Sequence, residues 1–253
     1  MNKLPLVVKI ASKILIVTAF LLSAGQSFAL TLSDIETQIR RNVRDTAASG
    51  NRYSDAILDD WINEAQREIV NMTWSVSAST NIALVAGTTY YSIPDDFITP
   101  YLVLFTETGE DTIQMKERLE GSLYDDNPSF ENTSSGSPTE YFLRQSLSGG
   151  NNLQIGFIQV PTSSSTGTVR VDYFAYADDL SSDSDVPFGG LLHLKPYHYS
   201  LVNHVTAKIK ALEGKTNEAD FYRQEFEKGI SIMDQRLKEA PNYRPGVRAA
   251  TGR

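Results

Sequence analysis

The three histidines are the first residues in this sequence whose chemistry could be catalytic or metal-binding. His193, His198 and His204 are five and six residues apart. At 3.6 residues per helical turn, a separation of six places two rings about 240° apart, so His198 and His204 cannot bind one metal ion from a single helix face. Zinc ligands on helices favour shorter separations. The histidines are therefore predicted to be exposed or hydrogen-bonded, and no metal ligands are predicted.

Adjacent acids are the second candidates for chemistry, at Asp59–Asp60, Asp95–Asp96 and Asp178–Asp179. Glycoside hydrolysis needs two carboxylates across a sugar. No apolar cleft that would raise the pKa of one member of a pair is evident, so a cell-wall glycosidase is only a minor hypothesis. The stretch "DDLSSDSD" lacks the central glycine and closing glutamate of a calcium loop, and is predicted to be a solvated connection.

Nucleotide-binding and nucleophile motifs are missing. "GKT" at 214–216 would need a glycine in place of Ile209 and a preceding strand to form a phosphate loop, and a helix is predicted there. The sequence has no nucleophile elbow, no dinucleotide fingerprint and no cysteine. It therefore predicts no catalytic residues, no cofactor and no enzymatic activity.

Residues 1–29 have the pattern of a secretory signal. Three lysines precede the apolar run Ile14 to Leu22, and the segment ends in Ser27-Phe28-Ala29, so cleavage would follow Ala29. The run is too short to span a bilayer, which needs about 20 residues. Removing the segment takes away three lysines and no acid, so the formal charge falls from −8 to about −11. Such an acidic body does not bind nucleic acid by neutralising phosphates.

Apolar residues at helical spacing predict the elements that position these groups. The predicted helices span residues 33–46, 54–74, 197–213 and 217–239. Ser33 and Glu36 are expected to form a capping box on the first helix, and Ser54 to cap the second.

The apolar stripes of these helices also predict which residues are buried. The predicted core anchors are Trp61, Ile62, Tyr222 and Phe226. The residues of the second helix expected to face solvent are Asn63, Glu64, Gln66, Arg67 and Glu68.

Residues 81–177 alternate in the manner of strands. "NIALV" and "TYYSI" are predicted to form a hairpin, and "YLVLFTE", "YFLRQ", "LQIGFIQV" and "VRVDYFAY" to complete a small antiparallel sheet. Polar loops are expected at 124–138 and 177–190. The predicted fold class is α+β: an N-terminal helical pair and a C-terminal antiparallel helical hairpin pack as a bundle, with the sheet inserted between them.

The last residues, 241–253, are predicted to form a basic C-terminal arm because they carry arginines and no apolar period. The candidate residues for contact with a partner protein or a neighbouring subunit are Tyr243, Arg244, Arg248 and Arg253. A frayed terminus without a partner is the alternative.

Four stretches in order resemble the head-to-tail adaptor (connector) proteins of tailed bacteriophages. They are "YSDAILDDWINEAQREI", "LVAGTTYYSIPDDFI", the sheet formed by "GSPTEYFLR", "LQIGFIQVP" and "VRVDYFAYADDL", and the closing "LKPYHYSLVNHVTAKIKALEGKTNEADFYRQEFEKGI". The resemblance covers residues 31–240, so the domain expected is 30–240.

The resemblance implies a structural virion protein. Such proteins form a homo-oligomeric ring, commonly dodecameric, beneath the portal protein, and extend the DNA channel without binding DNA specifically. They attach the tail or stopper protein and are not associated with a membrane in the assembled state. They often extend a C-terminal arm to the portal, and the corresponding residues here are 241–253. An acidic ring would also discourage phosphates from sticking to the channel.

The leader departs from this pattern, because adaptors assemble in the host cytoplasm and should begin near Leu30. Three explanations remain open: a start codon near Leu30 or Leu32, a retained leader that packs in the assembly, or genuine export. Under export, the chain would be a secreted or periplasmic β-rich binding protein with a cleaved signal peptide.

Overall fold

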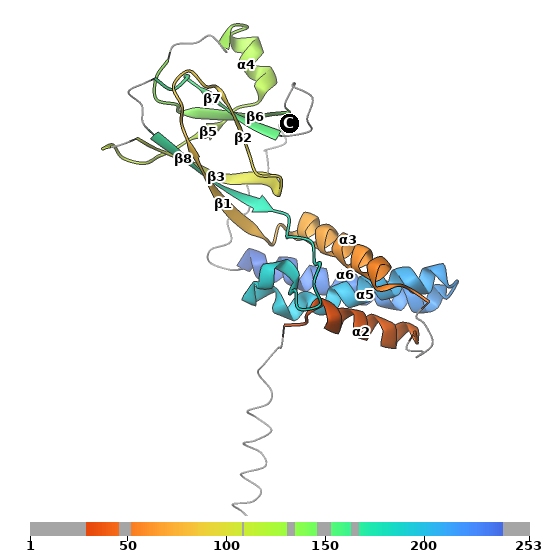
Figure 1. The fold of residues 1–253 in the computed structure, drawn as a ribbon. Helices are drawn as coiled ribbons and strands as arrows, with labels where there is room; N and C mark the ends of the chain where they lie inside the picture. The colour runs from red at the N-terminus through yellow and green to blue at the C-terminus, as the bar shows by residue number, and fades with distance from the viewer. Residues whose placement is uncertain are drawn as a thin grey trace, which may run out of the picture.

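The structure, a computed structural model, contains helices at both ends of the chain and strands between them (Figure 1). It describes residues 29–45, 52–107, 109–130, 135–145, 153–162 and 167–239. The predicted α+β class is confirmed. The arm at 241–253 and all but the last residue of the leader lie outside the described residues. No helix within the described part is long and apolar enough to cross a membrane.

Four long helices form the lower part of the molecule in Figure 1. Their bounds are α2 Leu32–Val43, α3 Asp55–Thr73, α5 His198–Leu212 and α6 Thr216–Glu239. Ser54 caps α3 as predicted, accepting from the N–H of Ile57. The capping box of α2 lies two residues earlier than predicted: Thr31 accepts from the N–H of Asp34, whose carboxylate accepts from the N–H of Thr31.

The four helices share one apolar core. α5 lies at its centre and packs against α2, α3 and α6. Ile35 and Ile39 of α2, Ile62 of α3 and Leu201 of α5 are completely buried there, and Phe226 joins them from α6. Burial of these side chains, at about 1.5–3 kcal/mol each, is the main term that stabilises the helical unit.

The strands form two sheets, not the single sheet predicted. Their orders are β1-β8-β3-β4 and β2-β7-β6-β5, and every pairing is antiparallel except β5 with β6. The bounds are β1 Ser77–Ala83, β2 Tyr90–Ser92, β3 Phe97–Glu107, β4 Ile113–Gln114, β5 Lys116–Glu117, β6 Glu140–Gln145, β7 Leu153–Ile158 and β8 Gly167–Ala175.

The predicted hairpin between "NIALV" and "TYYSI" is wrong. β1 pairs with β8, and β2 pairs with β7 in the other sheet. The chain turns between the sheets at Val85, whose N–H donates to the hydroxyl of Tyr91 at 2.9 Å. The two sheets share a core that contains Val103, Phe157 and Val171, so β1 and β2 each pair with a strand that contributes side chains to this core.

A short helix, α4 (Glu120–Asp126), occupies the start of the predicted 124–138 loop. Leu123 anchors it against Phe130 and Phe142. Phe142 is fully buried because Gly156, its partner across β6 and β7, leaves room for the ring. A Cβ at Gly156 would lie far inside van der Waals contact of that ring.

We predict that Gly156→Ala lowers the free energy of unfolding by about 1–3 kcal/mol, because the added methyl overpacks the core. Gly121→Ala is the matched control, since it adds the same methyl in α4 where no atom lies within 4 Å. The control should be neutral or stabilising by up to about 1 kcal/mol. Urea unfolding monitored by circular dichroism measures both, and equal effects would contradict the packing argument.

The chain comes back from the sheets to the bundle through residues 177–190, here called the return segment. Two side chains of α3 bind its backbone. The Asn63 amide exchanges two hydrogen bonds with Leu180, at 2.8 and 3.0 Å. Gln66 donates to the carbonyl of Asp178 and accepts from the N–H of Phe188, each at 2.8 Å. The short 3-10 helices η2 (Pro187–Gly190) and η3 (Leu192–Tyr197) then lead into α5.

One prediction about this region is wrong. Asn63 and Gln66 were expected to face solvent, but Gln66 has an exposed fraction of 0%. The stretch "DDLSSDSD" is exposed at most of its positions, as predicted for a solvated connection, but its Leu180 is buried in the helical core, as is Phe188 further along. The return segment also accepts hydrogen bonds from the start of α2: the N–H groups of Leu32 and Ser33 donate to the carbonyls of Asp185 and Asp183.

We predict that Gln66→Leu destabilises the fold by about 1–3 kcal/mol, because it leaves the buried N–H of Phe188 without a partner and removes the part-buried bond to the carbonyl of Asp178. Gln224→Leu makes the same change on the exposed face of α6 and should have little effect. Thermal and urea unfolding of both variants measure the difference. A loss for Gln66→Leu no larger than for Gln224→Leu would contradict this role.

Candidate interaction surface

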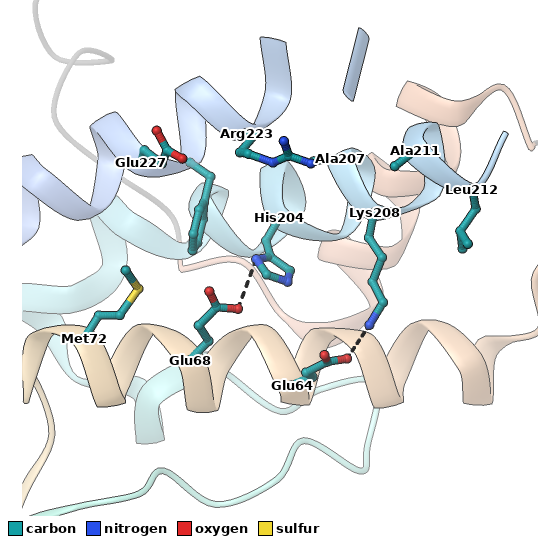
Figure 2. Close-up of a pocket in the computed structure, with 11 residues that line it drawn as sticks. Glu64, Glu68, Met72, His204, Ala207, Lys208, Ala211, Leu212, Arg223 and Glu227 are labelled. Atoms are coloured by element: carbon teal, nitrogen blue, oxygen red, sulfur yellow. Dashed lines mark hydrogen bonds and ion pairs between the residues drawn. The ribbon is translucent and has the colours of Figure 1, made fainter. Parts of the chain in front are cut away.

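A groove crosses the solvent side of the bundle, between α3 and α6 and over α5 (Figure 2). Its volume is about 580 Å³. Its lining residues are Glu64, Glu68, Met72, His204, Ala207, Lys208, Ala211, Leu212, Arg223, Phe226 and Glu227. It therefore combines apolar side chains with both signs of charge.

The floor of the groove is aromatic and its ends are apolar. The rings of His204 and Phe226 meet edge to face, with centroids 4.9 Å apart. Met72 and Leu212, with exposed fractions of 58% and 67%, lie at opposite ends of the groove in Figure 2. Large exposed apolar side chains beside a concave surface are typical of a protein–protein contact site.

The cations of the groove already have partners. Lys208 forms an ion pair with Glu64 and lies 5.3 Å from the centre of the Trp61 ring. Arg223 pairs with Asp220 at 3.2 Å, one turn earlier in α6. The ion pairs of both cations are therefore with acids other than Glu68 and Glu227.

Two carboxylates of the groove have no cationic partner among the described residues. Glu68 lies 3.5 Å from the Nδ1 atom of His204, but burial lowers the pKa of His204 below its usual 6.5, so the ring is largely uncharged at neutral pH. Glu227 forms no ion pair within the same part of the chain. The groove thus presents one unneutralised carboxylate from α3 and one from α6.

The other histidines lie elsewhere. His193 is exposed, whereas His198 is buried and its Nδ1 accepts from the N–H of Leu30 at 3.2 Å. Burial lowers the pKa of His198 to about 4, so its ring stays neutral as an acceptor. Within the described residues, no group of three or more histidine, cysteine or acidic side chains is arranged to hold a metal ion.

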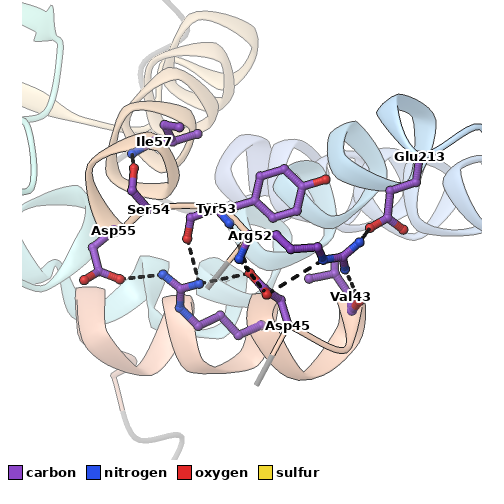
Figure 3. A network of polar contacts seen from close by, with 9 residues as sticks. Val43, Asp45, Arg52, Tyr53, Ser54, Asp55, Ile57 and Glu213 are labelled. Carbon is purple, nitrogen blue, oxygen red and sulfur yellow. Dashed lines mark hydrogen bonds and ion pairs between the residues drawn. The ribbon is translucent and has the colours of Figure 1, made fainter. Parts of the chain in front are cut away.

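A second polar cluster closes the end of the bundle that lies away from the sheets (Figures 1 and 3). The buried carboxylate of Asp45 accepts from the N–H groups of Arg52 and Tyr53 and from the Arg40 guanidinium. Arg52 reaches Glu213, just after α5, at 2.6 Å. These ion pairs join the end of α2, the start of α3 and the end of α5, so the cluster is a structural clamp.

Next to this clamp, α2 and α3 bring two carboxyl groups together. Burial raises the pKa of Glu36 from 4.5 to about 8, and the nearby carboxyl of Asp59 adds to the shift. The charge of Asp55 also raises the pKa of Glu36, and the charge of Arg40 lowers it. Glu36 therefore holds a proton at neutral pH.

A family model described as "SU10 adaptor protein" matches residues 30–249, which is most of the chain. The chain belongs to the SU10 adaptor protein family. The expected resemblance to phage head-to-tail adaptors is thereby confirmed.

Other comparisons add little to this assignment. No curated protein matches the chain. A chain in a solved structure titled "Neck of empty GTA particle computed with C6 symmetry" is 15% identical, and the match covers 71% of this chain and 78% of that one. The TM-score is only 0.26, so the family assignment rests on the sequence match alone.

In this SU10 adaptor family member, the predicted core anchors occupy two environments. Ile62 and Phe226 are buried in the bundle core, whereas Trp61 and Tyr222 are only partly buried. Trp61 packs at the edge of the core, against the ring of Tyr53 and beneath Lys208. The candidate contact residues Tyr243, Arg244, Arg248 and Arg253 lie outside the described residues.

Sequence reasoning missed the groove and the buried amides. A signal existed for Gln66, because it follows Ile62 by four residues and precedes Ile69 by three, which places it on the buried stripe. The groove had no such signal, because its walls come from helices more than 130 residues apart in the chain.

We predict that the free energy of unfolding falls as pH rises from about 4.5 to 8. In the unfolded chain Glu36 loses its proton near pH 4.5, whereas in the folded chain it keeps it to about pH 8, so stability present at low pH is lost over this window. Glu36→Gln should reduce the change of the unfolding free energy with pH, whereas Glu110→Gln, which alters an exposed acid, should leave that change as it is. Urea unfolding at each pH measures this, and parallel profiles for the three proteins would contradict it.

Proposed function

We propose that this protein is a structural head-to-tail adaptor of a tailed phage particle. In this role, many copies form a ring, dodecameric in the simplest case, beneath the portal protein. The ring extends the DNA channel and offers the attachment surface for a tail or stopper protein. The single observation that carries the proposal is the match to the adaptor family over residues 30–249.

The chemistry of the chain is consistent with this role. The clamp at the end of the bundle and the buried amides of α3 use their polar groups in ion pairs and hydrogen bonds that hold the fold together. The formal charge of −8 disfavours adhesion to phosphates, which suits a channel wall through which DNA passes without specific binding. We therefore propose that the protein acts by assembly and not by catalysis.

The proposed location is the neck of the virion, after assembly in the host cytoplasm. The family match begins at residue 30, directly after the signal-like leader. Neither this match nor the fold supports the alternative of an exported binding protein. Mass spectrometry of the N-terminus from purified virions distinguishes a retained leader, with Met1 present, from a chain that starts at Leu30.

Binding to the portal tests the proposal directly. We expect the purified chain, mixed with its portal protein, to co-elute as one large particle whose mass, measured by light scattering, exceeds that of the portal by many copies of the chain. A portal from an unrelated particle serves as the control and should not gain mass. A chain that stays monomeric and elutes separately from its own portal would contradict the adaptor function.

A further inference from the structure

The groove between α3 and α6 is suited to a basic, partly apolar segment. Glu68 and Glu227 offer carboxylates without cationic partners in the described residues, and Phe226 and Met72 offer apolar contact between them. Figure 2 shows Glu227 on α6 above His204 and Glu68 on α3 below it. Arginine is the side chain that best matches this arrangement, since its planar head pairs with carboxylates and packs on aromatic faces.

Residues 241–253 of the chain have the complementary chemistry. The sequence "PNYRPGVRAATGR" carries three arginines, no acid, and the apolar contacts of a tyrosine and a valine. No other stretch of thirteen residues after the leader has three cations and no acid. The positive charge of this segment therefore complements the carboxylates of the groove.

The segment is long enough to extend well beyond the end of its own α6. α6 ends at Glu239, and the fourteen residues that follow can extend over about 45 Å. A closed ring is built from heterologous contacts, in which one surface of each subunit binds a different surface of the next. The groove and the basic segment are two such surfaces on one chain.

We propose that the groove binds residues 241–253 of a neighbouring copy of this chain. Arg244 and Arg248 pair with Glu68 and Glu227, and the apolar residues of the segment pack on Met72 and Phe226. This inference rests on the proposed ring assembly and adds to it the contact between successive subunits.

Site-specific disulfide formation tests the contact, because the chain contains no cysteine. Two full-length chains with different tags, one carrying Met72→Cys and the other Val247→Cys, are co-expressed, assembled with the portal and mildly oxidised. We expect a disulfide between the two tagged chains. Val85→Cys replaces Met72→Cys in the control, since both side chains have an exposed fraction of 58% and Val85 lies in the sheet region away from the groove. The control should yield several-fold less product.

Removing the charges of the two groove carboxylates tests whether they bind the arginines of the segment. Glu68→Gln with Glu227→Gln in the groove chain should reduce the yield of the disulfide several-fold, and Glu110→Gln with Glu225→Gln, which alters exposed acids outside the groove, should not.

Three results would overturn the inference: a yield equal to that of the Val85 control, a yield unchanged by the groove substitutions, or a disulfide formed only within one chain when both cysteines are placed in it. If rings form on the portal without the disulfide, the inference fails and the adaptor function stands. If no ring forms on the portal, the proposed function itself fails.

Discussion

The fold depends on the hydrogen bonds between two buried amides of α3 and the backbone of the return segment. The chain leaves the bundle at the end of α3 and builds two sheets before it returns, so nothing local holds the two ends of this excursion together. Asn63 and Gln66 supply that connection through four hydrogen bonds to residues 178–188. Three of these bonds are buried, and leaving such a buried group without a partner costs about 1–3 kcal/mol.

Two faces of α3 make different contacts. Asn63 and Gln66 face the return segment, which also caps the start of α2. Glu64, Glu68 and Met72 recur every four residues, so they share another face and form one wall of the groove. Fixing α3 against the return segment therefore also fixes the wall of the proposed subunit contact. One helix thereby couples the stability of the fold to the geometry of assembly.

Much of this could be predicted from the sequence, and the exceptions have physical causes. The helices were predictable because their apolar stripes repeat locally, and the family was predictable because four stretches occur in order. The pairing of β1 with β8 was not, since the partners are about 90 residues apart and adjacency in sequence favours a hairpin. Gln66 was misassigned because a polar side chain is normally exposed. The groove was not predictable, because its charge balance depends on which acids already have partners.

The central claim is that copies of this chain assemble as a ring on the portal. Electron cryo-microscopy of the full-length chain bound to its portal tests it most directly. The account predicts a closed ring coaxial with the portal, with the helical units side by side, density for residues 241–253 in the groove of the adjacent subunit, and an open central channel. Isolated subunits, or density at the portal with no ring symmetry, would contradict it.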